Sequence, residues 1–232
     1  MKLAIMQPYL FPYIGYFQLM NAVDTFVVYD DVNFIKRGWI NRNRILVNGN
    51  AHLFTVPLKN ASQNVFIKNL CVAVSETWRK KFLKTLELSY KKAPFFDHIF
   101  ENIKEIISLR SEYLTDWYLK SFDFFREYLG INNRLVESSI TYQNQSLTGP
   151  TRILDICLRE NAEQYLNPQG GQKLYDRHIF LEKKIRLSFL IPQEIVYQQF
   201  NYPFVPGLSI LDVMMFNSQA TTRKYLLRYE LI

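Results

Sequence analysis

The sequence predicts an α/β protein built on a doubly wound, mostly parallel, Rossmann-like sheet, with a β-hairpin and a helical insertion. Three observations predict this class. Strand and helix patterns alternate at both ends of the chain, an Asn-Gly pair lies between two strand-like segments, and residues 76–130 have helical patterns. The 232 residues fit a single α/β domain, 1–232, that contains this helical middle section.

The N-terminal segment predicts a strand, a helix and a second strand. Residues 3–6 form an apolar run that a Gln-Pro pair ends, which is typical of a buried strand entering a loop. A helix follows, because Pro12 suits a first helical turn and apolar residues recur behind it. The apolar run 26–29 then ends at two aspartates. Ligands of doubly wound sheets bind beyond the carboxyl ends of the strands, so loops 7–12 and 30–42 are expected at the ligand edge.

A hairpin and three helices are predicted next. Residues 43–47 and 53–56 are strand-like and flank Asn48-Gly49, which is a strong signal for a tight turn. The helical patterns that make up the middle section run over 76–91, 94–108 and 111–129.

The alternation of strands and helices resumes after the helical section. Strands are predicted at 135–137, 164–166, 185–191 and 195–197. Helices are predicted at 149–161 and 209–216, the second with Ser209 as a candidate cap. The further loops expected at the ligand edge are 138–148, 167–175 and 204–208.

The charge of the chain indicates an anionic partner. A formal net charge of +7 and a pI near 9.3 fit a nucleotide, a nucleotide-sugar, a nucleic acid or a membrane surface. The basic residues are spread along the chain without a basic tail, which argues against nucleic acid. The 15 Tyr and 18 Phe supply rings that can stack on a sugar or base, although most are expected in the core.

Cysteine, histidine and the N-terminus give no sign of a metal site, a disulfide framework or an anchor. Cys71 and Cys157 lack metal spacing and are predicted to be small buried apolar residues. The histidines, which are predicted to be structural, are His52, His98 and His178. The first apolar run is too short for a signal peptide or a membrane span, so a cytoplasmic protein without a span is expected. No motif indicates a cofactor.

The loop after the first strand is the first candidate site. A helix N-terminus there would offer free backbone amides to an anion. The residues assigned to substrate binding are Gln7, Pro8, Tyr9, Tyr13, Gly15 and Tyr16. The alternative is a proline-fixed turn whose aromatic side chains belong to the core.

The two aspartates after the second strand are the candidate catalytic residues. A carboxylate at this edge can bind a hydroxyl group or a metal ion, or act as a base. Asp30 and Asp31 are assigned this role. The alternative is that they only end the strand or cap a helix.

The segment after the aspartates concentrates basic and amide side chains around one tryptophan. Arginine offers a bidentate fork to phosphate or carboxylate, and tryptophan offers a stacking face. The residues assigned to substrate binding here are Lys36, Arg37, Trp39, Asn41, Arg42 and Arg44. A solvated basic loop is the alternative.

A glycine pair after a later strand is a weaker candidate. Gly170 and Gly171 permit close approach of the backbone to a ligand, and Tyr175 follows them. The pattern matches neither a Walker nor a dinucleotide fingerprint, and hydrolase and zinc motifs are also missing. A simple turn is the alternative.

The chain resembles the WbqC-like protein family over nearly its whole length. The strings that carry the resemblance are MQPY at 6–9, FPYIGY at 11–16, YDDV at 29–32, KRGWINRN at 36–43 and LSILD at 208–212. Similar pieces follow in the expected order at 138–139, 165, 170–171, 174–175 and 197–198. The resemblance adds Asp212 to the candidate substrate-binding residues.

The resemblance implies a place in the synthesis of bacterial lipopolysaccharide O-antigen or another surface polysaccharide. The implied activity is a transferase that modifies a nucleotide-linked sugar, with an amino-acid or acyl-like group as one candidate for the transferred part. A non-catalytic protein that binds a glycan or a partner enzyme of the same pathway is the first alternative. The second is a nucleotidyltransferase-like or nucleic-acid-modifying enzyme, although the His-x-x-His or His-x-Gly-His of nucleotidylyltransferase-type domains is missing.

Overall fold

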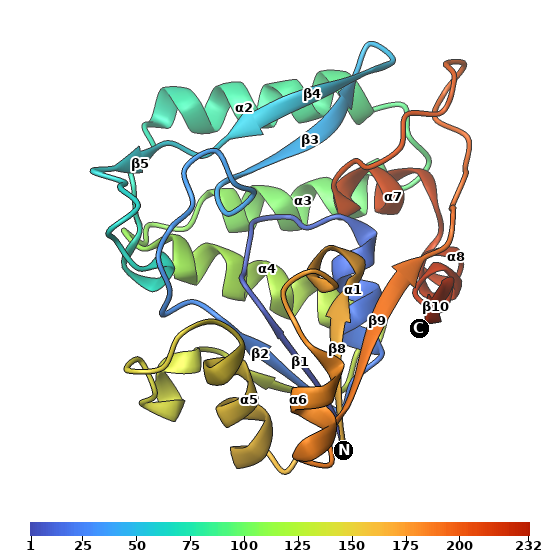
Figure 1. Cartoon of the computed structure of the whole chain (residues 1–232). Helices are drawn as coiled ribbons and strands as arrows, with labels where there is room; N and C mark the ends of the chain where they lie inside the picture. Colours follow the sequence, from blue (N-terminus) through green and yellow to red (C-terminus); the bar gives the residue numbers. More distant parts are fainter.

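The computed structural model describes all 232 residues and is built around one six-stranded sheet, in the order β10-β9-β8-β1-β2-β7 (Figure 1). All neighbours pair in parallel except the edge strand β10, which is antiparallel to β9. From β1 the chain first builds the sheet outward to β2 and β7, then returns and builds it in the other direction. The strands are β1 (Lys2–Met6), β2 (Thr25–Val28), β7 (Arg134–Val136), β8 (Gln164–Pro168), β9 (Arg186–Pro192) and β10 (Tyr229–Leu231).

Both faces of this sheet are buried, as the predicted doubly wound fold requires. Side chains alternate along a strand, so Leu3 and Ile5 point to one face and Ala4 to the other. Leu3 and Ile5 belong to a cluster with α5 (Gly149–Arg159) and α6 (Arg177–Glu182). Ala4 belongs to the main core with α1 (Ile14–Asn21) and α4 (Leu114–Leu129). The Rossmann-like architecture is therefore confirmed.

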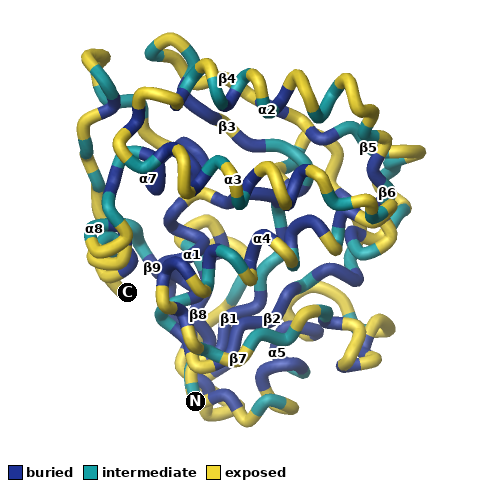
Figure 2. The backbone as a smooth tube through the Cα atoms, turned by 180° about the vertical axis from the view of Figure 1, so that it is seen from behind, coloured by how far each residue is buried: buried dark blue, intermediate teal, exposed yellow.

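The helical middle section packs beyond the sheet and carries much of the aromatic core. It consists of α2 (Glu76–Tyr90), α3 (Phe96–Ile107) and α4, with the hairpin of β3 (Arg42–Val47) and β4 (Asn50–Thr55) beside α2 (Figure 1). Phe11 lies between rings of the hairpin, α2 and α4, which explains why the N-terminal loop is fixed to this section. Figure 2 shows that buried positions concentrate in the central strands, whereas α2 and α3 alternate between buried and exposed.

Small elements complete the fold. A two-stranded sheet pairs β5 (Leu58–Lys59) with β6 (Cys71–Val72). Short 3₁₀ turns are η1 (Ile67–Asn69), η2 (Ser139–Tyr142) and η3 (Gln169–Gly171). The C-terminal part contains α7 (Ile210–Phe216) and α8 (Gln219–Tyr225). The buried amide of Gln18 donates to the carbonyls of Tyr225 and Arg228 and joins this part to α1.

Three predictions about local structure are wrong. Pro12 does not lie in the first helical turn, because α1 begins at Ile14 and Tyr13 is its N-cap. Residues 195–197 are not a strand, because β10 already occupies the edge of β9 at 190–192 and the chain leaves the sheet after Pro192. Cys71 is only partly buried, whereas Cys157 is fully buried as expected. The predicted cap of α7 is confirmed, since the Ser209 hydroxyl accepts from the backbone N–H of Leu211.

Candidate functional site

The switch point of the sheet lies between β1 and β8, where the chain changes its direction of winding. Gln7 follows β1 directly; its side chain is half-buried and makes no hydrogen bond within the chain. Gly170 and Gly171 follow β8. A Cβ at Gly171 would lie 1.9 Å from Asn167 Oδ1, whereas the space around Gly170 is open. The glycine pair therefore permits a close packing on one side and leaves backbone accessible on the other.

The loop from Gln7 to Tyr13 is held from two distant parts of the chain. The Phe11 carbonyl accepts hydrogen bonds from Asn43 Nδ2 at 2.6 Å and Ser209 Oγ at 2.7 Å. The Pro12 carbonyl accepts from the Ile210 N–H at 2.7 Å. Phe11 has φ +51°, a left-handed conformation that is uncommon for a bulky residue and that these bonds help to hold. The loop is thus a rigid connection rather than a mobile one.

The three tyrosines of this loop region differ in accessibility. Tyr16 is only 3% exposed and its hydroxyl is buried without a partner, so the side chain belongs to the core. Tyr9 is half-buried, and its hydroxyl accepts from the Tyr13 N–H at 3.3 Å. Tyr13 is exposed, and its hydroxyl fills the space that a Cβ at Gly15 would need. Burial raises the pKa of all three phenols, which are therefore neutral hydrogen-bonding groups.

A cavity of about 160 Å³ lies beside the start of α1, at the carboxyl end of β9. Tyr13 lines it together with Tyr197 and with the loop 204–208 that was expected at this edge. Most of its lining is apolar, so it suits a hydrophobic or ring-bearing part of a ligand.

Both carboxylate oxygens of Asp31 accept hydrogen bonds from within the chain. One carboxylate oxygen accepts from the Ser139 hydroxyl, and the other accepts from Gln145 Nε2 at 2.8 Å and from Arg152 Nη2 at 2.6 Å. The Arg152 guanidinium also donates to Asn144 and lies over the Tyr29 ring, 5.0 Å from its centre. Burial alone would raise the pKa of Asp31, but these hydrogen bonds and the Arg152 charge outweigh it and lower the pKa. Asp31 is therefore a buried carboxylate paired with the Arg152 guanidinium.

Asp30 has a different environment from its neighbour. Its Oδ1 accepts from the Ser138 hydroxyl at 2.7 Å and from the Ser139 N–H at 3.2 Å. Its Oδ2 accepts no hydrogen bond from the chain. Burial raises the pKa of Asp30 despite the hydrogen bond from Ser138, and no cation is paired with it. A carboxylate with one uncommitted oxygen and a raised pKa is chemically suited to accept a proton.

The basic segment lies beside the N-terminal loop, since the Leu10 N–H donates to the Ile40 carbonyl. Lys36, Arg37 and Arg42 line one cavity of about 320 Å³. The Arg42 guanidinium donates a hydrogen bond only through Nε, to the Gly38 carbonyl at 2.7 Å. This leaves both terminal nitrogens of the guanidinium able to bind an anion.

The other members of the basic segment have structural contacts of their own. Asn41 donates its amide to the Val56 carbonyl at 2.8 Å and so fastens the segment to the hairpin. Trp39 is 45% exposed, and the guanidinium carbons of Arg42 and Arg44 lie 5.8 Å and 5.1 Å from its ring centre. These cations stack on the ring face that was predicted for a ligand.

Asp212 is completely buried at the junction of α7, α2 and the segment after β9. Its carboxylate accepts from Tyr90 Oη at 2.8 Å, Tyr197 Oη at 2.5 Å and Gln199 Nε2 at 2.6 Å. The Tyr90 hydroxyl also accepts from the Leu46 N–H of the hairpin. Burial raises the pKa of Asp212, against the three hydrogen bonds that lower it. Asp212 positions Tyr197, which lines the cavity beside Tyr13.

The side chains that bind Asp31 and Asp212 could not be predicted from the sequence. Arg152 lies in the predicted helix 149–161, where no motif marks it, yet it is only 3% exposed. Gln145 and Tyr90 likewise do not belong to any recognisable motif. The sequence predicted loop 138–148 only as one of the loops at the ligand edge of the sheet.

The structure shows neither a cluster of metal-binding side chains nor a helix that could span a membrane. No group of three or more His, Cys, Asp or Glu side chains gathers closely enough to hold a metal ion. None of the helices combines the length and apolar character needed to cross a bilayer.

Comparisons with known proteins give one family. The model of the WbqC-like protein family matches residues 7–224. The uncharacterized protein Rv1507c of Mycobacterium tuberculosis is 30% identical over 229 residues, which cover 97% of this chain and 97% of that protein. No solved structure matches the chain. The family match includes the loop after β1, both aspartates, the basic segment and Asp212.

Proposed function

The chain belongs to the WbqC-like protein family, and from this premise we propose that it is a transferase of bacterial surface-polysaccharide synthesis. Its substrate in this proposal is a nucleotide-linked sugar, to which an amino-acid or acyl-like group is added. The family's association with polysaccharide gene sets supports the pathway. The positive charge of the chain supports an anionic, nucleotide-bearing substrate.

The observation that carries the proposal is that uncommitted polar groups follow three adjacent strands at the ligand edge of the sheet. Gln7 after β1 and Oδ2 of Asp30 after β2 make no hydrogen bond within the chain. The open Gly170 backbone follows β8, next to β1. Polar groups at buried or half-buried positions normally find partners, so their freedom at this edge favours a ligand as the partner.

The proposed chemistry gives the two aspartates different roles. Asp30 accepts the proton of an acceptor hydroxyl or amine on the sugar while that oxygen or nitrogen attacks the acyl carbon of the donor. The leaving group of the donor departs with the bonding electron pair. Asp31 touches no reacting atom in this scheme; it and Arg152 hold the loop in which Ser138 and Ser139 position Asp30.

The substrate phosphates are proposed to bind the cavity lined by Lys36, Arg37 and Arg42. Gln7 and the exposed Gly170 backbone would orient the sugar, and Tyr13 would contact its ring from the smaller cavity. Tyr16 and Asp212, which are enclosed in the core, act only by positioning their neighbours.

The test separates binding from turnover. Purified protein is titrated calorimetrically with a panel of nucleotide-sugars, and a bound sugar is then incubated with amino-acid and acyl donors while its mass is followed. Arg42→Gln should weaken binding by about tenfold, the loss of one charged hydrogen bond. Asp30→Asn should bind normally and lose turnover. Lys84→Gln, a surface change on α2, is the matched control. If no nucleotide-sugar binds and neither variant alters the cellular glycan, the proposal fails.

A non-catalytic binder of glycan or partner enzyme is the second candidate, and the confinement of Asp30 favours it. The residue Asp30 is only 1% exposed, which restricts the access of a substrate. In that case Asp30→Asn would leave the polysaccharide output of the cell unchanged, while changes in the basic cavity would still reduce it.

A further inference from the structure

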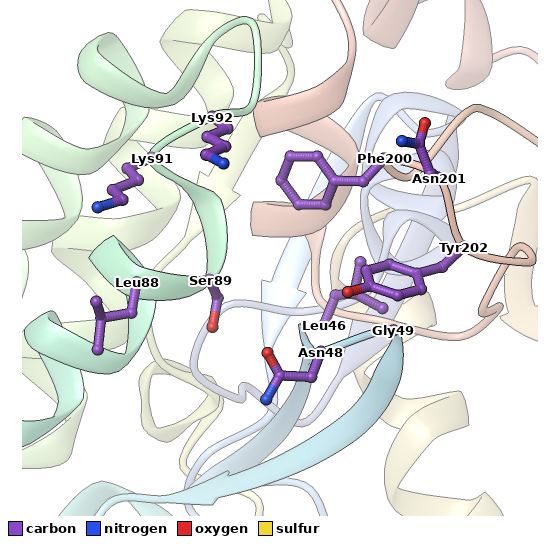
Figure 3. Close-up of a pocket in the computed structure, with 10 residues that line it drawn as sticks. All are labelled: Leu46, Asn48, Gly49, Leu88, Ser89, Lys91, Lys92, Phe200, Asn201 and Tyr202. Carbon is purple, nitrogen blue, oxygen red and sulfur yellow. The ribbon is translucent and has the colours of Figure 1, made fainter.

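A second cavity shares no lining residue with the residues assigned to the transferase site, and it is built by three separate segments. It has a volume of about 420 Å³, within the range of small-ligand sites. The tip of the β3–β4 hairpin, the end of α2 and residues 200–202 surround it (Figure 3). We propose that this cavity binds an anionic sugar, that is, a monosaccharide unit that carries a phosphate or carboxylate group.

The charge of the cavity is positive and not compensated. Lys91 and Lys92 directly follow α2, and no acidic residue lines the cavity. Glu87, the nearest carboxylate along the helix, pairs instead with Lys84 at 2.9 Å. In Figure 3 the ammonium group of Lys92 points toward the space in front of Phe200, whereas Lys91 extends away from it. Lys92 is therefore the cation that would meet the anionic group of a ligand.

The polar side chains around the cavity have no partners in the protein. The side-chain amides of Asn48 and Asn201 and the hydroxyl of Ser89 make no hydrogen bond within the chain; at Asn48 only the backbone carbonyl is used, by Asn50. Amides and a hydroxyl can both donate to and accept from sugar hydroxyl groups. An inorganic anion alone would leave most of these groups unused.

An aromatic ring completes the cavity. Tyr202 is 49% exposed and packs on Gly49, where a Cβ would lie only 2.7 Å from the ring. The absence of a side chain at Gly49, which has φ +75°, thus lets the ring lie on the hairpin tip. Figure 3 shows the hydroxyl of this ring directed toward Asn48 and Ser89. An exposed ring beside polar groups suits the apolar face of a sugar.

The backbone supports a functional role for the third segment. Phe200 has φ +52°, a conformation that bulky side chains rarely adopt and that is found preferentially at ligand sites. Its ring packs edge-to-face on Phe216 of α7, with ring centres 4.7 Å apart. This contact fixes the segment that carries Asn201 and Tyr202 over the hairpin.

The experiment follows backbone amide signals by NMR during titration with glucose 1-phosphate, glucuronate, glucose and inorganic phosphate. Glucose 1-phosphate or glucuronate should shift the amides of Gly49 and Asn201 in a saturable way, and whichever binds more tightly identifies the source of the charge. Lys92→Gln should weaken that binding by about tenfold. Lys80→Gln removes an exposed charge from α2, outside the cavity, and should not change that binding.

Several results would overturn the proposal. One is the lack of a saturable shift at Gly49 with either charged sugar. Another is equal weakening by the Lys92 and Lys80 changes, which would show general attraction to a basic surface. If inorganic phosphate bound as tightly as glucose 1-phosphate, the sugar would contribute nothing to binding and the proposed sugar site would be wrong. Nucleotide-sugar binding at the carboxyl edge is read separately from the Gly15 and Gly170 amides, so failure of one site is distinguishable from failure of the other.

Discussion

Two neighbouring stretches of this chain are in opposite physical states. Asp30 and Asp31 are each 1% exposed and are surrounded by hydrogen bonds from 138–152. The basic segment that follows is largely exposed, and Lys36, Arg37 and Arg42 form no ion pair with the chain. The residue types favoured a ligand site in both stretches, but contacts within the fold occupy most of the hydrogen-bonding groups of the two aspartates.

Within the proposed site, the difference separates residues that hold the structure together from residues that are free to face a ligand. A buried charge must be paired, so Asp31 and Arg152 stabilise the loop around them and are unavailable for a ligand. Exposed cations keep their hydration and can exchange it for a phosphate. Substitution of Asp31 should therefore affect stability, and substitution of the basic residues should affect binding.

The largest effect is expected at the buried ion pair. Asp31→Asn leaves the Arg152 guanidinium buried without its counter-charge, and the free energy of unfolding should fall by about 3–5 kcal/mol. Urea unfolding measures it. Glu87→Gln, which breaks the surface pair with Lys84, should cost less than about 1 kcal/mol. Similar losses in the two variants would contradict the assignment of Asp31 to the scaffold.

A smaller loss is expected where the hairpin meets α7. Tyr90→Phe removes the hydroxyl that accepts from the Leu46 N–H and donates to Asp212, so a buried donor and a buried carboxylate each lose a partner. The free energy of unfolding should fall by about 1–3 kcal/mol. Tyr113→Phe is the control, because that side chain is 50% exposed and its hydroxyl makes no hydrogen bond within the chain. Equal stability of the two variants would show that the Asp212 network is dispensable.

The two aspartates should also differ in the sign of their pH dependence. Burial raises the pKa of Asp30 above its ordinary value of 3.8, so the folded state holds the proton more tightly and the stability contribution falls as pH rises through the raised pKa. The pKa of Asp31 is lowered, so its contribution is present above 3.8 and lost as pH falls through the lowered pKa.

Unfolding of the wild type, Asp30→Asn and Asp31→Asn between about pH 3 and 7 tests this difference. The stability of the wild type relative to Asp30→Asn should decrease with pH, and that relative to Asp31→Asn should increase. Slopes of the same sign would mean that the two carboxyls share one environment.

The sequence predicted the fold well because the signals were local. The Gln-Pro pair after residues 3–6, the Asn-Gly turn and the Ser209 cap each act within a few residues, and all three lie where expected. One element that was not predicted depends on a distant partner. The edge strand β10 exists because β9 offers it an edge, and the same pairing excludes a strand at 195–197.

The sheet edge that carries the candidate residues was predictable from the sequence, but the contacts of each residue were not. The loops after β1, β2 and β8 follow from the winding rule. Nothing local shows that Arg152 reaches Asp31 across 121 positions, or that Asp212 accepts from Tyr90. Adjacent aspartates therefore looked equivalent in the sequence, and only their partners make them different.

The smallest effect on stability, and the one most informative about function, is expected in the basic cavity. Lys36→Gln combined with Arg37→Gln changes two exposed side chains that make no hydrogen bond within the chain, so the free energy of unfolding should change by less than about 0.5 kcal/mol. Binding of a nucleotide-sugar should still weaken by at least about tenfold, because each cation contributes a charged hydrogen bond to phosphate. Urea unfolding and calorimetry on the same preparation measure both. A stable variant with unchanged affinity would mean that the basic segment is a solvated surface and that the substrate phosphates do not bind there. Weakened binding at full stability would instead show that the ligand-facing residues are those that the fold leaves unpaired.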